Sequence, residues 1–519
     1  MARDAPSEAG PRSPGPVQPP EEFDPARGCQ DPSTGAIAAL FALTMVVLYG
    51  LYQKVEPHGG PPLPNPVPWA GPAVLNRDYP DLLLLLSLVL ALMVTWELLR
   101  GRAQRILALL IAGGTVLGAA AAAGGARFGV LGATSMETVH LGMWLAILLF
   151  WLAAGLKPLL GLHRYRARWG YAASSGTLRW LAGLVILGTV SMVAARHPFY
   201  ANEYYVNWRL TAQVLVFLYL FLGLPYAILS NLVPGPPGET LRDTGTILLL
   251  LTRLAGRWSG RRLGRVLRNR RARTALLDIL VKVYFVPVMI TFYFGNAGAI
   301  FTSLADVSSG WSADSLYRLG YHSFLFMDVS VCLLGYLSAS RWLGNKTRSV
   351  DGTMAGWTVA LACYPPFVAV SSSLLPYTTQ MGPEPWLRFT RLPGLDSETG
   401  LWLDGALAIL LRVVALLALA LYVSAQVSFG LRFSNLTHRG IISRGPYAWV
   451  RHPAYVGKNL AWWSESILSF TSGWQFLFLA GWNIVYTARA LTEERHLGHF
   501  ADYRSYCARV RWRFLPGLW

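Results

Sequence analysis

Residues 81–99 read Asp81-Leu-Leu-Leu-Leu-Leu-Ser-Leu-Val-Leu-Ala-Leu-Met-Val-Thr-Trp-Glu-Leu-Leu99, an almost uninterrupted apolar run. A helix needs roughly 17–25 such residues to cross the hydrocarbon core of a bilayer. Comparable runs recur along the 519-residue chain, which is 53% hydrophobic and 14% charged. Soluble domains carry about 25% charged residues. The sequence therefore predicts an all-α fold, a polytopic integral membrane helical bundle.

The apolar runs predict about 12 transmembrane helices. The last two are separated only by Thr471-Ser-Gly473, which favours a tight helical hairpin. The predicted spans are residues 36–52, 81–99, 105–123, 138–156, 178–195, 210–232, 275–295, 321–340, 354–375, 401–424, 455–471 and 474–490.

The basic residues predict the orientation of the bundle. The loop from Arg253 to Arg273 carries nine arginines and no acid, so the positive-inside rule places it in the cytoplasm. Counting spans outward from this loop places both termini in the cytoplasm. The same rule accounts for the net charge of +18, so the sequence predicts no nucleic-acid partner. The four cysteines show no metal-ligand spacing, so we predict no metal site.

Composition divides the chain into three parts. Residues 1–35 hold eight prolines and no apolar periodicity, which predicts a disordered cytoplasmic tail. Residues 36–400 form a membrane region of about nine spans, for which the sequence indicates no role. Residues 401–519 contain the densest set of polar groups next to apolar runs, and such groups are usually functional in membranes. A Pro/Gly-rich outer loop is also predicted at residues 57–80.

The first polar motif is Tyr447-Ala-Trp-Val-Arg-His-Pro-Ala-Tyr-Val-Gly457, at the start of a predicted span. Proline suits the first turn of a helix, where free backbone N–H groups can bind a carboxylate. Arg451 can bind a carboxylate through two hydrogen bonds, and Tyr455 lies on the same helix face as His452. The motif predicts a site for an amino-acid-like anion. Its alternative is a basic helix end that anchors the span among lipid headgroups.

The second motif is Glu493-Glu494, after the last span. A hairpin of the last two spans would bring it within reach of the first motif, where two carboxylates suit a cation or the hydroxyls of a ribose. The alternative is a solvated helix turn in which Glu493 pairs with Arg489. Residues 497–516 then alternate apolar and basic side chains at helical spacing, which predicts an amphipathic helix that lies on the membrane or over the site.

These two motifs together resemble the isoprenylcysteine carboxyl methyltransferase family and the wider set of membrane phospholipid methyltransferases. The resemblance covers about residues 405–519. It implies S-adenosylmethionine bound at the cytoplasmic face and a lipophilic acceptor, an isoprenoid, lipid or lipid-modified molecule, entering from the bilayer. Carried over by position, it implies a set of cofactor-binding residues: Tyr447, Arg451, His452, Pro453, Tyr455, Gly457, Glu493 and Glu494.

Two polar residues within the penultimate span depart from the apolar tunnel that the resemblance implies. Lys458 and Glu465 both lie where a lipophilic acceptor is expected. Glu465 is a candidate base or ligand for a polar group of the acceptor, with a structural partner as the alternative. Arg451 and Glu465 are the candidate catalytic residues.

Two other functions stay open at this point. The C-terminal residues from Tyr506 to Pro516 also resemble the membrane sterol reductases, which implies NADPH as the cofactor. A transporter or scaffold with a vestigial cofactor motif is the third possibility, although no pair of Gly/Pro-broken spans suggests inverted repeats. The sequence indicates neither the acceptor nor the oligomeric state.

Overall fold

A computed structural model provides the structure of this chain. The structure describes the greater part of the chain, in ten stretches. These are residues 33–55, 78–98, 102–128, 136–160, 169–201, 205–232, 270–340, 343–374, 388–467 and 469–518. The predicted tail before residue 33, most of the predicted outer loop at 57–80, and most of the arginine-rich loop at 253–273 lie outside these residues.

The described residues are almost entirely helical, as the apolar runs predict. The longer helices are α2 (Ser33–Val55), α3 (Tyr79–Leu98), α4 (Arg102–Phe128), α5 (Met136–Leu160), α6 (Trp169–Arg196), α7 (Val206–Leu232), α10 (Arg270–Ser309), α11 (Ala313–Leu337), α14 (Ser397–Val427), α15 (Pro453–Ser466) and α16 (Trp474–Leu497). The shorter elements are α12 (Met354–Leu361), α13 (Phe367–Leu374), α17 (Ala501–Arg509), the 3-10 helices η3 (Pro198–Tyr200), η5 (Phe389–Arg391), η6 (Gly430–Arg432) and η7 (Gly445–Ala448), and the strands β1 (Ser349–Val350) and β2 (Thr437–His438).

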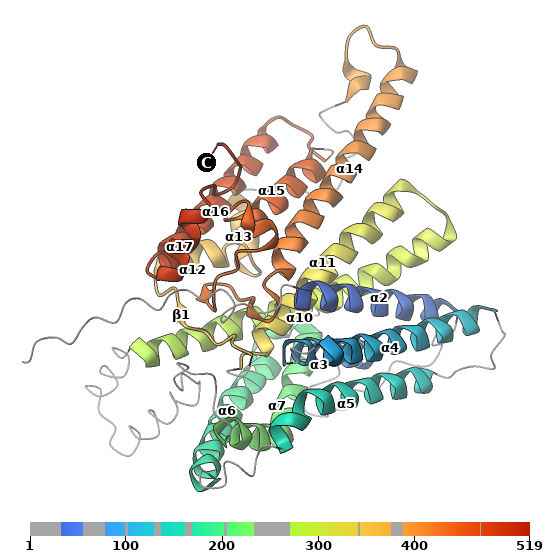
Figure 1. Ribbon diagram of the computed structural model, residues 1–519. Helices are drawn as coiled ribbons and strands as arrows, with labels where there is room; N and C mark the ends of the chain where they lie inside the picture. The colour runs from blue at the N-terminus through green and yellow to red at the C-terminus, as the bar shows by residue number, and fades with distance from the viewer. Residues whose placement is uncertain are drawn as a thin grey trace, which may run out of the picture.

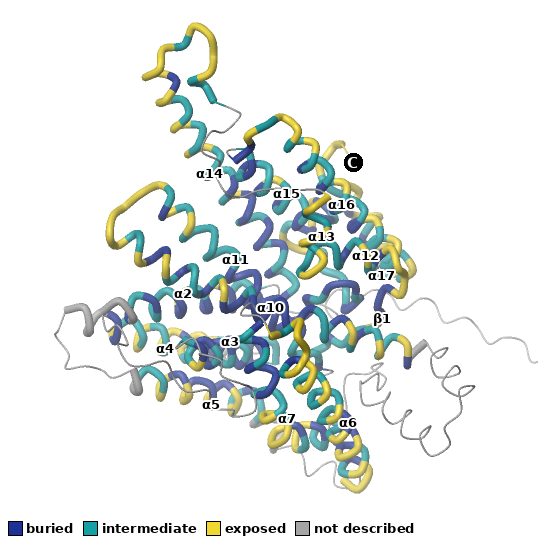
Figure 2. Tube along the Cα trace, turned by 180° about the vertical axis from the view of Figure 1, so that it is seen from behind, coloured by how far each residue is buried: buried dark blue, intermediate teal, exposed yellow. Residues whose placement is uncertain are grey.

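Eight of these helices are long and apolar enough to cross a bilayer: α2, α3, α4, α6, α7, α10, α11 and α14. The helices α5, α6, α7 and α14 also expose large apolar side chains, among them Leu141, Leu181, Phe221 and Leu417. Figure 2 shows such exposed residues along α6 and α7, while the buried residues concentrate where α10 and α11 meet their neighbours. Exposed apolar surface of this extent suits lipid, so the chain is an integral membrane protein.

The helices form two groups with α10 and α11 between them (Figure 1). On one side α2–α5 pack together, and on the other α14–α17 pack together beside α12 and α13. α11 contacts both α2 and α14, and α6 pairs with α7. The polar C-terminal region is therefore built against helices that precede residue 400.

Four of the predicted spans have no counterpart among these eight helices. The predicted span 138–156 lies in α5, whose described apolar part, Val139–Gly155, is shorter. The run 354–375 is split into α12 and α13 around Pro365-Pro366, because proline cannot continue a helix from its interior. α15 has 14 residues, about 21 Å of helix, which is shorter than a bilayer core. α16 has 24 residues but falls outside the eight apolar helices, since Gln475, Asn483 and Arg489 interrupt its apolar part. The total of twelve spans and the cytoplasmic termini remain predictions.

A two-stranded sheet joins the two sides of residue 400. β1 pairs antiparallel with β2, with Ser349 opposite His438 and Val350 opposite Thr437. The ladder continues at both ends, because the N–H of Arg348 donates to His438 O at 2.8 Å and that of Asp351 to Leu436 O at 2.8 Å. The segment that follows α14 is thus fixed against the segment that follows α11.

The predicted amphipathic helix over residues 497–516 is wrong in length. α17 spans only Ala501–Arg509, and the chain continues as a non-helical tail. The tail makes tertiary hydrogen bonds in place of helical ones. Trp512 O and Arg513 O each accept a hydrogen bond from a backbone N–H of the segment before α15. Two locations were predicted for this segment, on the membrane or over the site. The tail lies against the first polar motif and so occupies the second location.

Candidate functional site

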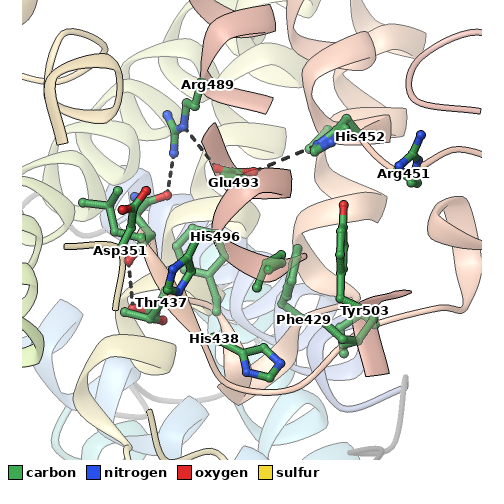
Figure 3. Close-up of a pocket in the computed structure, with 18 of the residues that line it drawn as sticks. Asp351, Phe429, Thr437, His438, Arg451, His452, Arg489, Glu493, His496 and Tyr503 are labelled. Atoms are coloured by element: carbon green, nitrogen blue, oxygen red, sulfur yellow. Dashed lines mark hydrogen bonds and ion pairs between the residues drawn. The ribbon is translucent and has the colours of Figure 1, made fainter. Parts of the chain in front are cut away.

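A cavity of about 160 Å³ lies where the ends of α12, α14, α16 and α17 meet the start of α15. This volume exceeds what a single water molecule needs. Five residues of the predicted cofactor set line it, namely Tyr447, Arg451, His452, Tyr455 and Glu493. Figure 3 shows Arg489, Glu493 and His452 along one side of this cavity, with Asp351, His438 and His496 on another. The structure therefore brings the two sequence motifs to one site.

The start of α15 is fixed by the C-terminal tail. The backbone N–H groups of Arg451 and His452 donate to Trp512 O and Arg513 O, both at 2.9 Å. The N–H groups of Tyr455 and Val456 donate to His452 O. The sequence led us to expect free N–H groups at this turn, ready for a ligand carboxylate. The expectation is wrong for these four donors, because the protein's own carbonyls accept their hydrogen bonds.

Glu494 is the centre of an ion cluster. Its carboxylate lies 3.0 Å from Arg451 Nη1, 3.2 Å from His452 Nε2 and 2.9 Å from Arg513 Nε. The side chains of Arg451, His452 and Glu494 are 13%, 8% and 10% exposed. Glu494 is absent from the cavity wall. The cluster therefore links the first motif, the second motif and the tail, and it holds them in fixed relative positions.

Glu493, in contrast, faces the cavity and is 32% exposed. It accepts a hydrogen bond from the Tyr455 hydroxyl, and Arg489 Nε lies 3.5 Å from its carboxylate, as the sequence alternative proposed. Arg489 also donates to Asn435 Oδ1 at 2.6 Å. Because Arg489 is buried between these groups, it holds Glu493 and the loop after α14 in fixed relative positions.

Aromatic rings complete this wall. The ring of His452 stacks on Tyr455 with centroids 5.6 Å apart and planes 9° apart. The Arg489 guanidinium lies 5.5 Å from the Tyr455 ring and 5.6 Å from the ring of Tyr364, which is the range of cation–π attraction. Tyr447 is buried, and its carbonyl accepts a hydrogen bond from the Tyr506 hydroxyl at 2.8 Å.

Pro453 and Gly457 shape α15 and do not line the cavity. Pro453 is the first residue of the helix. A Cβ added at Gly457 would lie 2.6 Å from Tyr422 N and 2.7 Å from Ala418 O of α14. Since real side chains do not approach a backbone so closely, glycine is what allows α15 to pack tightly on α14.

The two polar residues of the penultimate span occupy different places. Glu465 lies twelve residues after Pro453, about 18 Å along the helix, where its carboxylate is beside Tyr317 of α11. It is not part of the cavity wall, so the structure does not bring the two candidate catalytic residues together. The ammonium of Lys458 lies 5.1–5.6 Å from the rings of Tyr422, Trp462 and Tyr486, one helical turn from Tyr455.

Sequence reasoning missed three residues of the cavity wall, of which Asp351 precedes residue 400 and His438 and His496 follow it. Asp351 lines the cavity and lies 3.5 Å from Arg495 Nη2. His438 and His496 also line it; His438 Nε2 lies 3.2 Å from Asp502 of α17, and His496 Nε2 lies 3.1 Å from Ser349 Oγ. No spacing signal links these residues, because strands of two residues leave no periodicity to detect.

The carboxylates of Glu494 and Asp502 make the site sensitive to acid. Burial raises the pKa of each group, but for Glu494 the hydrogen bonds from His452 and Arg513, and for Asp502 the pairing with His438, outweigh it and lower the pKa. A depressed native pKa stabilises the fold above the unfolded-state values, about 4.3 for Glu and 3.9 for Asp, and this contribution is lost as the pH falls through the native values.

We therefore expect these two carboxylates to make the thermal-unfolding midpoint fall steeply below about pH 4.3. The measurement is a series of unfolding curves of the detergent-purified protein at constant ionic strength. Asp502→Asn should reduce the slope of the acid limb, because it removes one of the two titrating carboxylates. A midpoint that is unchanged down to pH 3 would contradict the assignment.

Comparison with known families gives one match, in the region that contains the site. Residues 401–500 match the family model of the phospholipid methyltransferases. No curated protein sequence matches the chain. The match confirms the resemblance to membrane methyltransferases that the two motifs indicated. It covers most of α14 and all of α15 and α16, and it leaves out α12, α17 and the tail, which also contribute to the site.

Proposed function

We propose that this protein is an S-adenosylmethionine-dependent membrane methyltransferase that acts on a lipophilic acceptor. The observation that carries the proposal is the cavity itself. It joins Arg451, His452 and Tyr455 of the first motif with Glu493 of the second, within the segment that matches the methyltransferase family. The bound cofactor would supply an activated methyl group.

The residues of the cavity suit the chemistry of that cofactor, which carries an ammonium, a carboxylate, a ribose and an adenine ring. Glu493 and Asp351 are acceptors for the ammonium or the ribose hydroxyls, and Arg489 is a donor for the carboxylate. The ring of Phe429 offers an apolar wall for the adenine. Within the described residues, the buried atoms Thr437 Oγ1 and His438 Nδ1 make no hydrogen bond. Buried polar atoms normally have partners, so this pair fits a ligand that supplies them.

Methyl transfer to a nucleophile mainly requires that two reactants are held in line. In this chain that task falls to residues that are themselves held in place. Arg489 and the Tyr455 hydroxyl hold the Glu493 carboxylate from two sides. The Glu494 cluster fixes the turn that carries His452. The network is therefore ordered before any ligand binds, which lowers the entropy cost of binding.

The acceptor side of the proposal rests on the residues one turn deeper in the bundle. From Tyr455 the helix face leads to Lys458, around which lie the rings of Tyr422, Trp462 and Tyr486. Tyr422 is hydrogen-bonded to Asp328 of α11 at 2.7 Å. Rings with a single cation among them suit an acceptor that has an apolar body and one polar group.

The test is thermal stabilisation of the purified protein by S-adenosylhomocysteine, with NADPH in parallel. We expect S-adenosylhomocysteine alone to raise the unfolding midpoint. Glu493→Gln should weaken this binding at least tenfold, because it removes the carboxylate that faces the cavity. Glu398→Gln is the matched control, since Glu398 is exposed in the first turn of α14. Stabilisation by NADPH without S-adenosylhomocysteine would favour a reductase and overturn the proposal.

A further inference from the structure

A second polar cluster lies in α2–α5, the region for which the sequence indicated no role. Tyr49, Asp81 and His140 line a small cavity of about 30 Å³ whose other walls are mainly apolar. His140 Nε2 lies 2.7 Å from Asp81 Oδ1, and the Tyr49 hydroxyl donates to the other carboxylate oxygen of Asp81. Asp81 lies in the first turn of α3 and His140 near the start of α5, so the cluster is at one end of these apolar helices, where ionisable side chains can meet a polar head group.

This cluster is remote from the candidate active site. A Cβ added at Gly35 would lie 1.8 Å from Val427 O, so the start of α2 packs directly on the end of α14, next to the first cavity. Tyr49 lies fourteen residues further along α2, about 21 Å away. In Figure 1, α3–α5 and α15–α17 lie on opposite sides of α10 and α11. The cluster therefore serves a site of its own.

An apolar groove leads from the cluster along α4 and α5. A cavity of about 360 Å³ runs between these helices, and it shares Ala119, Val139 and Met143 with the cavity at Asp81. Its walls include Gly114, Gly118 and Gly142, where an added Cβ would meet nothing within 4 Å. These glycines are exposed, so the groove is open to the surface along this stretch, with room for a chain of methylene groups.

We propose that α2–α5 bind a single-chain amphiphile, with its chain in the α4–α5 groove and a hydrogen-bond-donating head, an amine or an alcohol, at Asp81. A carboxylate has about four lone-pair sites, so Asp81 can accept a further hydrogen bond beside those from Tyr49 and His140. An anionic head would meet the carboxylate of Asp81 and that of Asp78 in the turn before it, which lies 3.4 Å from the Tyr49 hydroxyl. The inference is independent of the methyltransferase proposal.

Native mass spectrometry of the detergent-released full-length protein tests this, with dodecylamine, dodecanol and dodecanoate as probes of equal chain length. We expect one bound amine or alcohol per chain and at least tenfold weaker binding of dodecanoate. The amine and alcohol arms distinguish a cationic head from a neutral one. Asp81→Asn should weaken the amine at least tenfold.

Gly118→Leu should abolish binding of the preferred probe, because the new side chain fills the groove without touching Asp81. Gly188→Leu in α6 is the matched control, since a Cβ there also meets nothing within 4 Å and the residue lies outside both cavities. Equal binding of dodecanoate, or unchanged binding in Gly118→Leu, would show unspecific lipid filling and overturn the proposal. Should Asp81→Asn fail to fold, Gly118→Leu and the dodecanoate comparison decide the question.

Discussion

Replacement of Glu494 by glutamine is expected to destabilise the fold strongly and to abolish the response to S-adenosylhomocysteine. Glu494 is the shared partner of Arg451, His452 and Arg513. Its loss leaves the guanidinium groups of Arg451 and Arg513 close together without their shared carboxylate, beside the ring of His452. Removal of one partner from a buried ion pair costs about 3–5 kcal/mol, and Arg513 is 30% exposed and can turn to water. We therefore expect a loss of about 3 kcal/mol in the free energy of unfolding.

The measurement is the unfolding free energy of the purified protein with and without S-adenosylhomocysteine. Glu493→Gln provides the comparison that separates structure from ligand contact. Glu493 lines the cavity and keeps an acceptor for Tyr455 as glutamine, but it loses its charge pairing with the buried Arg489. This variant should therefore lose ligand affinity with a smaller loss of stability than Glu494→Gln. If Glu494→Gln unfolds like the wild type and only ligand binding is lost, Glu494 contacts the ligand directly and the cluster assignment is wrong.

The juxtaposition of the two motifs was predictable, whereas their internal pairing was not. Forty-two residues separate His452 from Glu494, yet a helical hairpin brings them to 3.2 Å, because α16 follows α15 after a short link and runs back beside the start of α15. A sequence shows that cations and carboxylates are available. It does not show whether Arg451 binds a ligand's carboxylate or that of Glu494, since both satisfy the same charge.

The contribution of residues before 400 could not be predicted for a different reason. Asp351 reaches the site only because β1 pairs with β2, and a pairing of two residues per strand has no sequence signature. The break at Pro365-Pro366 was visible in the sequence, but the apolar residues on both sides of it were read as one span. The two prolines end the helix there, although the residues on both sides are apolar. The apolar runs themselves predicted the eight long helices well, because in a membrane hydrophobicity and length largely decide what spans.

Arg439→Met is expected to show how far the candidate site depends on the helices that precede it. Arg439 is 2% exposed and does not line the cavity. Its guanidinium donates to Gly335 O at 2.7 Å and to Thr347 Oγ1 at 3.2 Å, and it lies 3.8 Å from Asp278 of α10. One side chain of the β2 segment thus binds α10, the end of α11 and the segment before β1.

Methionine at this position removes every one of these donors while it keeps most of the side-chain volume. Gly335 O loses a charge-assisted hydrogen bond, and Asp278 keeps only Lys282 at 2.8 Å and the hydroxyl of Thr347 as partners. Unpaired buried polar groups cost about 1–3 kcal/mol each, so the unfolding free energy should fall by about 3–5 kcal/mol. Because His438 and Gly440 flank Arg439 and line the cavity, binding of S-adenosylhomocysteine should weaken at the same time.

Arg444→Met is the matched control, because it makes the same exchange in the same segment at an exposed side chain. It should leave both the unfolding free energy and the ligand response unchanged. Arg439→Met with lowered stability and full ligand affinity would show that residues 401–519 form the site without the helices before them. Loss of affinity in Arg439→Met alone would show that the matched methyltransferase segment depends for its site on α10 and α11, to which Arg439 ties it.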